Sequence, residues 1–187
     1  LKNLANLTTV SLSGGNATDI DFSMLEASAA NLTRFSFYDR AFKASAKNIA
    51  SLKKFTKLET LRLTGVPLEA NDVKNIGAVT SLTTLRVDFS TIADLSPLKN
   101  LTNLTRLEVA NQRVSARTTS ATFPSPLKDP NGAVVAITDG ASLVNDGDNP
   151  GAIKVANPIY DGAERTLREN WNANVTIGHV TAPFSGE

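Results

Sequence analysis

Large apolar residues recur along residues 7–109 as a leucine followed by apolar residues three and five positions later. In every copy the last two apolar positions are separated by one polar residue, the alternation expected of a strand with one buried side. The pattern therefore predicts five short strands that each turn two apolar side chains inward. The five copies are Leu7, Val10 and Leu12; Leu32, Phe35 and Phe37; Leu58, Leu61 and Leu63; Leu82, Leu85 and Val87; and Leu104, Leu107 and Val109.

The spacing of the copies indicates a repeat. Their first leucines lie 25, 26, 24 and 22 residues apart, within the range of roughly 20–29 residues that marks leucine-rich repeats. One repeat cannot bury its apolar side chains alone, so neighbours must stack into a continuous core. We therefore expect residues 1–114 to form a leucine-rich repeat domain of about five repeats. The sequence begins within a repeat, at Leu1 and Leu4, and we expect an N-terminal cap to be missing from it.

The segments between the predicted strands carry a different apolar pattern. Pro97 fits the first turn of a helical or 3₁₀ segment, and earlier segments have apolar residues at every third position, as in the buried stripe of a short helix. These positions predict a helical or 3₁₀ convex side behind a parallel concave sheet. They are Ile49, Leu52 and Phe55, and Val73, Ile76 and Val79.

The repeat stops after Val114. Residues 115–130 are rich in Ser, Thr and Pro, and short β-like runs follow at residues 133–138 and 174–180. Turn signals such as Asn131-Gly132 and Asp146-Gly147 separate these runs. The expected fold class is therefore an α/β leucine-rich repeat solenoid over residues 1–114, followed by a small all-β sandwich over residues 115–187 that caps the last repeat.

Both parts, in this order, resemble the internalins, surface proteins of Gram-positive bacteria. Residues 94–112 (DLSPLKNLTNLTRLEVANQ) are similar to terminal internalin repeats, and residues 125–140 and 175–186 are similar to the immunoglobulin-like domain behind those repeats. The resemblance implies that residues 115–187 form such a domain, in incomplete form. It further implies an exported bacterial protein, secreted or attached to the cell wall, whose repeats bind a host or surface molecule.

The chain also departs from the internalin pattern. The position that holds a buried asparagine in internalin repeats carries other residues here, so we expect other hydrogen bonds to hold the turns. These residues are Gly15, Arg40, Val66, Ser90 and Gln112.

Charge and composition narrow the choice of partner. The 187 residues carry a net charge of only +1 and no cysteine, so there is no global field to recruit nucleic acid or an anionic membrane. No apolar stretch is long enough to span a bilayer. We expect a monomer that binds a protein, with a glycan as the alternative partner.

The polar residues that alternate with the buried ones supply the candidate binding site. Four arginines among them form a possible basic stripe on the concave face, and Arg and Tyr are favoured at binding hot spots. The alternative is a solvated face on which these charges pair with one another. The candidate ligand-binding residues are Arg34, Ser36, Tyr38, Thr60, Arg62, Thr84, Arg86, Asp88, Arg106 and Glu108.

Residue types that support catalysis or metal binding are sparse. His179 is the only histidine, so it has no second histidine or cysteine for a metal set or a nucleophile–base pair, and we expect it to be an ordinary strand residue. The oxygen-rich loop 145–151 breaks the calcium-loop pattern at Pro150 and is interpreted as a surface turn. The carboxylates of Asp19 and Asp21 fall in predicted convex-side turns. We therefore expect no enzyme activity, no cofactor and no metal.

Six Asn-x-Ser/Thr sequons would suit a glycosylated eukaryotic receptor ectodomain. Most of them belong to the Asn-Leu-Thr of the repeat itself, and we interpret them as part of the repeat. The sequence thus predicts a non-catalytic protein-binding module of an exported bacterial surface protein, whose concave face recognises the ligand. The alternative is a structural spacer of a cell-surface adhesin that binds its ligand elsewhere.

Overall fold

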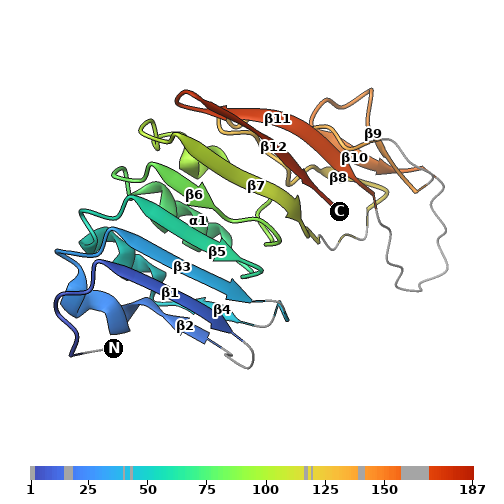
Figure 1. The fold of residues 1–187 in the computed structure, drawn as a ribbon. Helices are drawn as coiled ribbons and strands as arrows, with labels where there is room; N and C mark the ends of the chain where they lie inside the picture. Colours follow the sequence, from blue (N-terminus) through green and yellow to red (C-terminus); the bar gives the residue numbers. More distant parts are fainter. Residues whose placement is uncertain are drawn as a thin grey trace.

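A seven-stranded sheet dominates the computed structural model (Figure 1). The structure describes residues 3–14, 19–39, 41–42, 44–115, 118, 120–138, 142–156 and 169–187. Its strand order is β1-β3-β5-β6-β7-β12-β11. Strands β1 to β7 of this sheet run parallel, β12 runs parallel to β7, and β11 runs antiparallel to β12. The strands are β1 (Thr9–Gly14), β3 (Arg34–Asp39), β5 (Thr60–Thr64), β6 (Thr84–Arg86), β7 (Arg106–Gln112), β11 (Trp171–Ile177) and β12 (Val180–Gly186).

Shorter elements connect these strands. A parallel pair, β2 (Asp19–Asp21) and β4 (Ser45–Lys47), and an antiparallel sheet of β8 (Thr122–Pro124), β10 (Ala152–Val155) and β9 (Leu143–Asn145) form two smaller sheets. The helical segments pack behind one face of the large sheet (Figure 1). They are the 3₁₀ segments η1 (Phe22–Ser28), η2 (Ile49–Lys54) and η3 (Ser96–Leu98), and the α-helix α1 (Ala70–Gly77).

The core lies between the sheet and these helical segments. The last two apolar residues of the second to fifth copies are buried, as predicted, whereas Leu12 on the edge strand β1 is 39% exposed. From the helical side Ile49, Leu52, Val73 and Ile76 join the same core. One continuous apolar layer therefore fixes which side of each strand faces outward.

Other hydrogen bonds replace the asparagine of the repeat, as expected. The hydroxyl of Ser90 donates to the Val66 carbonyl at 2.6 Å. The buried side chain of Gln112 accepts from the Ile92 N–H at 3.0 Å and donates to the Val87 carbonyl at 2.8 Å. These contacts satisfy main-chain groups that the turns leave without a strand partner. Gly15 and Arg40 lie outside the described residues.

The expected fold class, a regular leucine-rich repeat solenoid followed by an immunoglobulin-like sandwich, is wrong. The returns behind the sheet are irregular: β2 with η1, β4 with η2, α1, and finally η3 alone. The C-terminal hairpin β11–β12 does not form a separate sandwich but extends the large sheet beyond β7. An open edge at β7 would leave its main-chain groups unpaired, and β12 covers that edge with Phe184 fully buried in the common core.

Of the two predicted C-terminal β-like runs, 174–180 is confirmed over residues 174–177, which lie in β11, and 133–138 is wrong. The chain turns at Gly178 and His179 between β11 and β12, so residues 174–180 are not one strand. Residues 133–138 form no strand. The main chain of Ile137 pairs instead with the Asn145 side-chain amide, which accepts from the Ile137 N–H at 3.0 Å and donates to the Ile137 carbonyl at 2.9 Å. The domain boundary at residue 114 stays a prediction, and Leu1 lies outside the described residues.

Candidate functional site

The face of the large sheet that points away from the helical segments is called the open face here, and it carries the candidate residues. Strand register sets them in rows across β3, β5, β6 and β7. One row runs Ser36, Arg62, Arg86, Glu108, and the row before it runs Arg34, Thr60, Thr84, Arg106. The rows follow from the side-chain alternation of parallel strands.

Two of the four arginines are tied into an ion-pair network. The Arg86 guanidinium donates from Nε and Nη2 to the two Asp88 oxygens, both at 2.9 Å, and Arg86 Nε lies 3.1 Å from Glu108. Glu108 also accepts from Arg106 at 2.7 Å. Asp88 is 5% exposed and accepts from the Thr64 hydroxyl at 3.0 Å. The hydrogen bond to Asp88 raises the pKa of Arg86 above its ordinary value, so Arg86 stays charged within the network.

The other two arginines are exposed. Within the described part of the chain the side chains of Arg34 and Arg62 have neither a carboxylate nor a hydrogen-bond partner. Arg62 lies opposite Arg86 on the neighbouring strand, and like charges in opposed positions repel each other. Asp88 and Glu108 pair with Arg86, and the Arg62 guanidinium has no acceptor among the described residues.

Tyr38 adds an aromatic side chain to this surface. It lies two residues after Ser36 on β3, opposite Thr64 of β5, and is 44% exposed. The residues Ser36, Thr60 and Thr84, which carry hydroxyl groups, are half-buried. The open face thus offers two unpaired guanidinium groups, one aromatic ring and several hydroxyl groups. On its β6–β7 side the charged side chains pair with one another.

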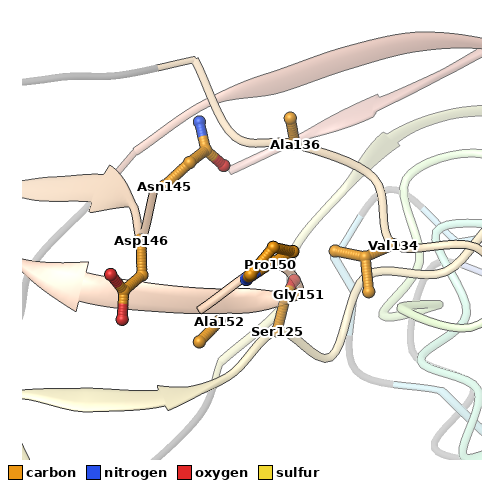
Figure 2. A pocket seen from close by; sticks show the side chains of 8 residues that line it. All are labelled: Ser125, Val134, Ala136, Asn145, Asp146, Pro150, Gly151 and Ala152. Carbon is orange, nitrogen blue, oxygen red and sulfur yellow. The ribbon is translucent and has the colours of Figure 1, made fainter. Parts of the chain in front are cut away.

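A shallow pocket of about 430 Å³ lies elsewhere, beside the antiparallel sheet β8–β10–β9 (Figure 2). The Asn145 amide points toward the segment with Ala136, and Asp146 is the only lining residue with an acid or base side chain (Figure 2). The Ser125 hydroxyl accepts from the Leu127 N–H at 3.2 Å. The lining residues are Ser125, Val134, Ala136, Asn145, Asp146, Pro150, Gly151 and Ala152. This pocket offers no nucleophile–base pair.

The remaining candidates have structural surroundings. His179 lies in the β11–β12 turn, not in a strand as predicted. Asp19 and Asp21 lie in strand β2, not in turns as predicted. Asp19 accepts from Ser45 and Lys47, both at 2.6 Å, and Asp21 caps η1 through the Ser23 N–H at 2.9 Å. Among the described residues no cluster of three His, Cys, Asp or Glu side chains is placed to hold a metal ion. No helix in the described ranges is long and apolar enough to cross a membrane.

The loop 145–151 forms a hydrogen-bonded turn, as interpreted from the sequence. Its main chain closes with Asp146 N–H to Ala152 carbonyl and Ala152 N–H to Asn149 carbonyl, both at 3.0 Å. Two sequon asparagines hold neighbouring turns: Asn31 donates to the Ala5 carbonyl at 3.2 Å and Asn103 to the Thr80 carbonyl at 2.9 Å.

Three surface residues beyond the carboxyl ends of the parallel strands were not predicted from the sequence. Phe42, Phe89 and Arg113 form what we call the edge cluster: the two rings lie 6.1 Å apart, and the Arg113 guanidinium lies 4.8 Å from the Phe42 ring centre. The signal that could have found them is the presence of two aromatic residues in turns, where polar residues and glycine are usual.

Neither the comparison with known protein families nor the comparison with curated proteins finds a match for this chain.

Proposed function

We propose that this chain is a non-catalytic binding module of an exported bacterial surface protein, and that it recognises a partner protein on the open face. The observation that carries the proposal is the contrast between Arg34 and Arg62, which are exposed without an acid partner, and Arg86 and Arg106, which are paired. The export and bacterial origin rest on the likeness of residues 94–112 to internalin repeats.

The charge arrangement supports a partner with acidic side chains. Arg62 is repelled by Arg86 and has no carboxylate beside it among the described residues. A carboxylate of a partner would accept from the fork-shaped guanidinium of Arg62 in a bidentate contact. Arg34 lies on the neighbouring strand β3, in the row before that of Arg62, and provides a second such contact. Exposed Tyr38 adds apolar area one row beyond the Ser36–Arg62 pair.

Capture of cell-surface proteins tests the proposal. The immobilised chain is compared with the double variant Arg34→Ala/Arg62→Ala and with the charge-matched control Lys53→Ala/Lys99→Ala, whose exposed lysines lie on the helical side. A partner retained by the parent and the control but lost by the arginine variant supports binding on the open face. A partner retained by all three, or none, favours the spacer role. A glycan array with the same three proteins separates a protein partner from an acidic glycan.

A further inference from the structure

We propose that the edge cluster of Phe42, Phe89 and Arg113 is a docking site for an acidic segment of a partner protein that carries an apolar side chain beside its carboxylates. This inference rests on the proposed function and names the chemistry of the partner. The open face supplies the contacts to carboxylates, and the edge cluster supplies the contact for the apolar side chain.

The first observation is the exposure of apolar rings at one place. Phe42 is 37% exposed and Phe89 is 38% exposed. Their rings tilt by 51° against each other, beyond the carboxyl ends of β3 and β6. Aromatic residues and arginine are enriched in protein interfaces, and an aromatic pair next to an arginine has the composition of a binding hot spot.

The second observation is backbone strain. Phe42 and Phe89 both have φ of +53°, in the left-handed region that bulky residues rarely occupy. Burial does not compensate for this strain, because both rings are more than one-third exposed. Strained residues that persist at the surface are concentrated at binding and active sites.

The third observation is that the surrounding hydrogen bonds hold the cluster in place. The buried carboxylate of Asp39 accepts from the Ala41 and Ala44 N–H groups, both at 2.8 Å, and so fixes the turn that carries Phe42. The Phe89 N–H donates to the Ala110 carbonyl at 3.2 Å. A methyl group on Gly65 would lie 2.1 Å from the Asp39 carbonyl and 3.4 Å from Phe42. A site shaped in advance in this way loses less conformational entropy when a partner binds.

Charge complementarity identifies the occupant. The Arg113 side chain is 60% exposed, and its only carboxylate neighbour among the described residues is Glu187, at 3.9 Å. Arg62 lies on β5, the strand that leads into Gly65 beside Phe42. The carboxylates of Asp39 and Asp88 near the cluster are buried, so the exposed Arg113 guanidinium beside exposed rings favours a segment that is both acidic and apolar.

A protein segment fits this site better than a glycan does. Arg113 already lies over the Phe42 ring, and the tilt between Phe42 and Phe89 prevents a flat aromatic platform. Sugar rings stack on flat, open aromatic faces, whereas an apolar side chain fits the angle between two tilted rings. We therefore commit to an extended or loop segment of a protein.

Selection of a displayed random peptide library on the full chain tests the inference. We expect the enriched peptides to combine Asp or Glu with an apolar residue. One enriched synthetic peptide is then titrated, by fluorescence anisotropy, against Phe42→Gly/Phe89→Gly, Arg113→Gln, Arg34→Ala/Arg62→Ala and the control Val134→Ala, an exposed apolar site elsewhere. Glycine accepts positive φ, so the double glycine variant keeps its fold, which circular dichroism verifies.

The inference predicts that Phe42→Gly/Phe89→Gly weakens peptide binding by about tenfold or more, the scale of a hot-spot loss, while Val134→Ala leaves it unchanged. If only the Arg34→Ala/Arg62→Ala variant loses binding, the edge cluster is excluded and the proposed open-face function stands. If neither double variant loses binding, both are overturned. The inference is overturned if no peptide is enriched, or if heparin fragments bind the edge cluster in place of a peptide. The inference is also overturned if the parent chain self-associates in sedimentation and the double glycine variant does not.

Discussion

Arg62 and Arg86 lie opposite each other on the parallel strands β5 and β6, yet only Arg86 has carboxylate partners. The Arg86 side chain is 37% exposed and that of Asp88 is 7% exposed, so their pair is partly shielded from water. Register thus sets two identical side chains next to each other, and Asp88, just beyond β6, and Glu108 on β7 pair with only one of them.

The first prediction concerns Asp88. Asp88→Asn removes the charge that holds Arg86 and weakens the contact with Thr64. We expect the free energy of unfolding to fall by about 1–3 kcal/mol, because two charge-assisted hydrogen bonds at the nearly buried Asp88 are lost. Urea denaturation measures this change. Glu108→Gln, at the more exposed end of the network, should cost less than about 1 kcal/mol, and an equal loss from both variants would contradict the distinction.

The second prediction concerns Gln112, whose side chain is fully buried. Gln112→Met keeps the volume but leaves the Ile92 N–H and the Val87 carbonyl without their partner. We expect a loss of about 2–3 kcal/mol, the cost of buried polar groups without hydrogen bonds. Hydrogen exchange of the Ile92 amide should accelerate in the variant. An unchanged exchange rate would show that another group replaces Gln112.

The third prediction measures backbone strain at Phe89. Phe89→Gly and Phe89→Ala both remove the ring, but only glycine is unstrained at φ of +53°. The glycine variant should be more stable than the alanine variant by about 0.5–1 kcal/mol, after the larger unfolded-state entropy of glycine is included. Thermal denaturation compares them. At exposed Thr181 in β12, where φ is not positive, the same pair of substitutions should rank in the opposite order.

The fourth prediction concerns Glu26 and pH. Hydrogen bonds from Lys54, at 2.6 Å, and from Ser51 lower the pKa of Glu26 below its ordinary value of 4.5. The carboxylate form is therefore favoured by folding, so its contribution is present above pH 4.5 and is lost as pH falls through the lower folded-state pKa. A carboxyl NMR titration should show this lowered pKa. Lys54→Met should bring it back toward 4.5, and an unchanged titration would assign the shift to other groups.

The fifth prediction concerns close packing where β12 meets β7. A methyl group on Gly186 would lie 2.1 Å from the Gln112 carbonyl and 2.5 Å from the Trp171 ring. Gly186→Ala should therefore destabilise the protein by about 1–3 kcal/mol or more, as overpacking does. Gly147→Ala is the matched control, since no atom lies within 4 Å of its added methyl group. Equal stability of the two variants in urea would contradict the β7–β12 packing.

The strands that follow the five apolar copies were predictable because local alternation fixes which side is buried. Phe35 and Phe37, or Leu61 and Leu63, are buried in β3 and β5 for this reason alone. The pairing of Phe184 with Val109 was not predictable, because alternation shows that a strand has a buried side but does not name its neighbour. An immunoglobulin-like sandwich and an added hairpin have similar sequence patterns.

The candidate site was predictable in part. Alternation placed Arg34, Arg62, Arg86 and Arg106 on one face, and the possible pairing of Arg86 with Asp88 followed from a spacing of two along a strand. The same spacing places Thr64, not an acid, two residues after Arg62. The contact of Arg86 with Glu108 depends in addition on the register between neighbouring strands. Phe42 and Phe89 were missed because turns have no periodicity that relates one to the other.

The position of β12 has a consequence for synthesis. Asn111 and Ser185, which meet where β7 joins β12, are 74 residues apart in sequence. A ribosome adds roughly 5–20 residues per second, so β7 waits about four to fifteen seconds for its second neighbour. During that interval the main-chain N–H and C=O groups along the outer edge of β7 have no strand partner and are exposed. Chaperone dependence and aggregation on rapid overproduction should therefore be greatest for chains arrested between β7 and β12.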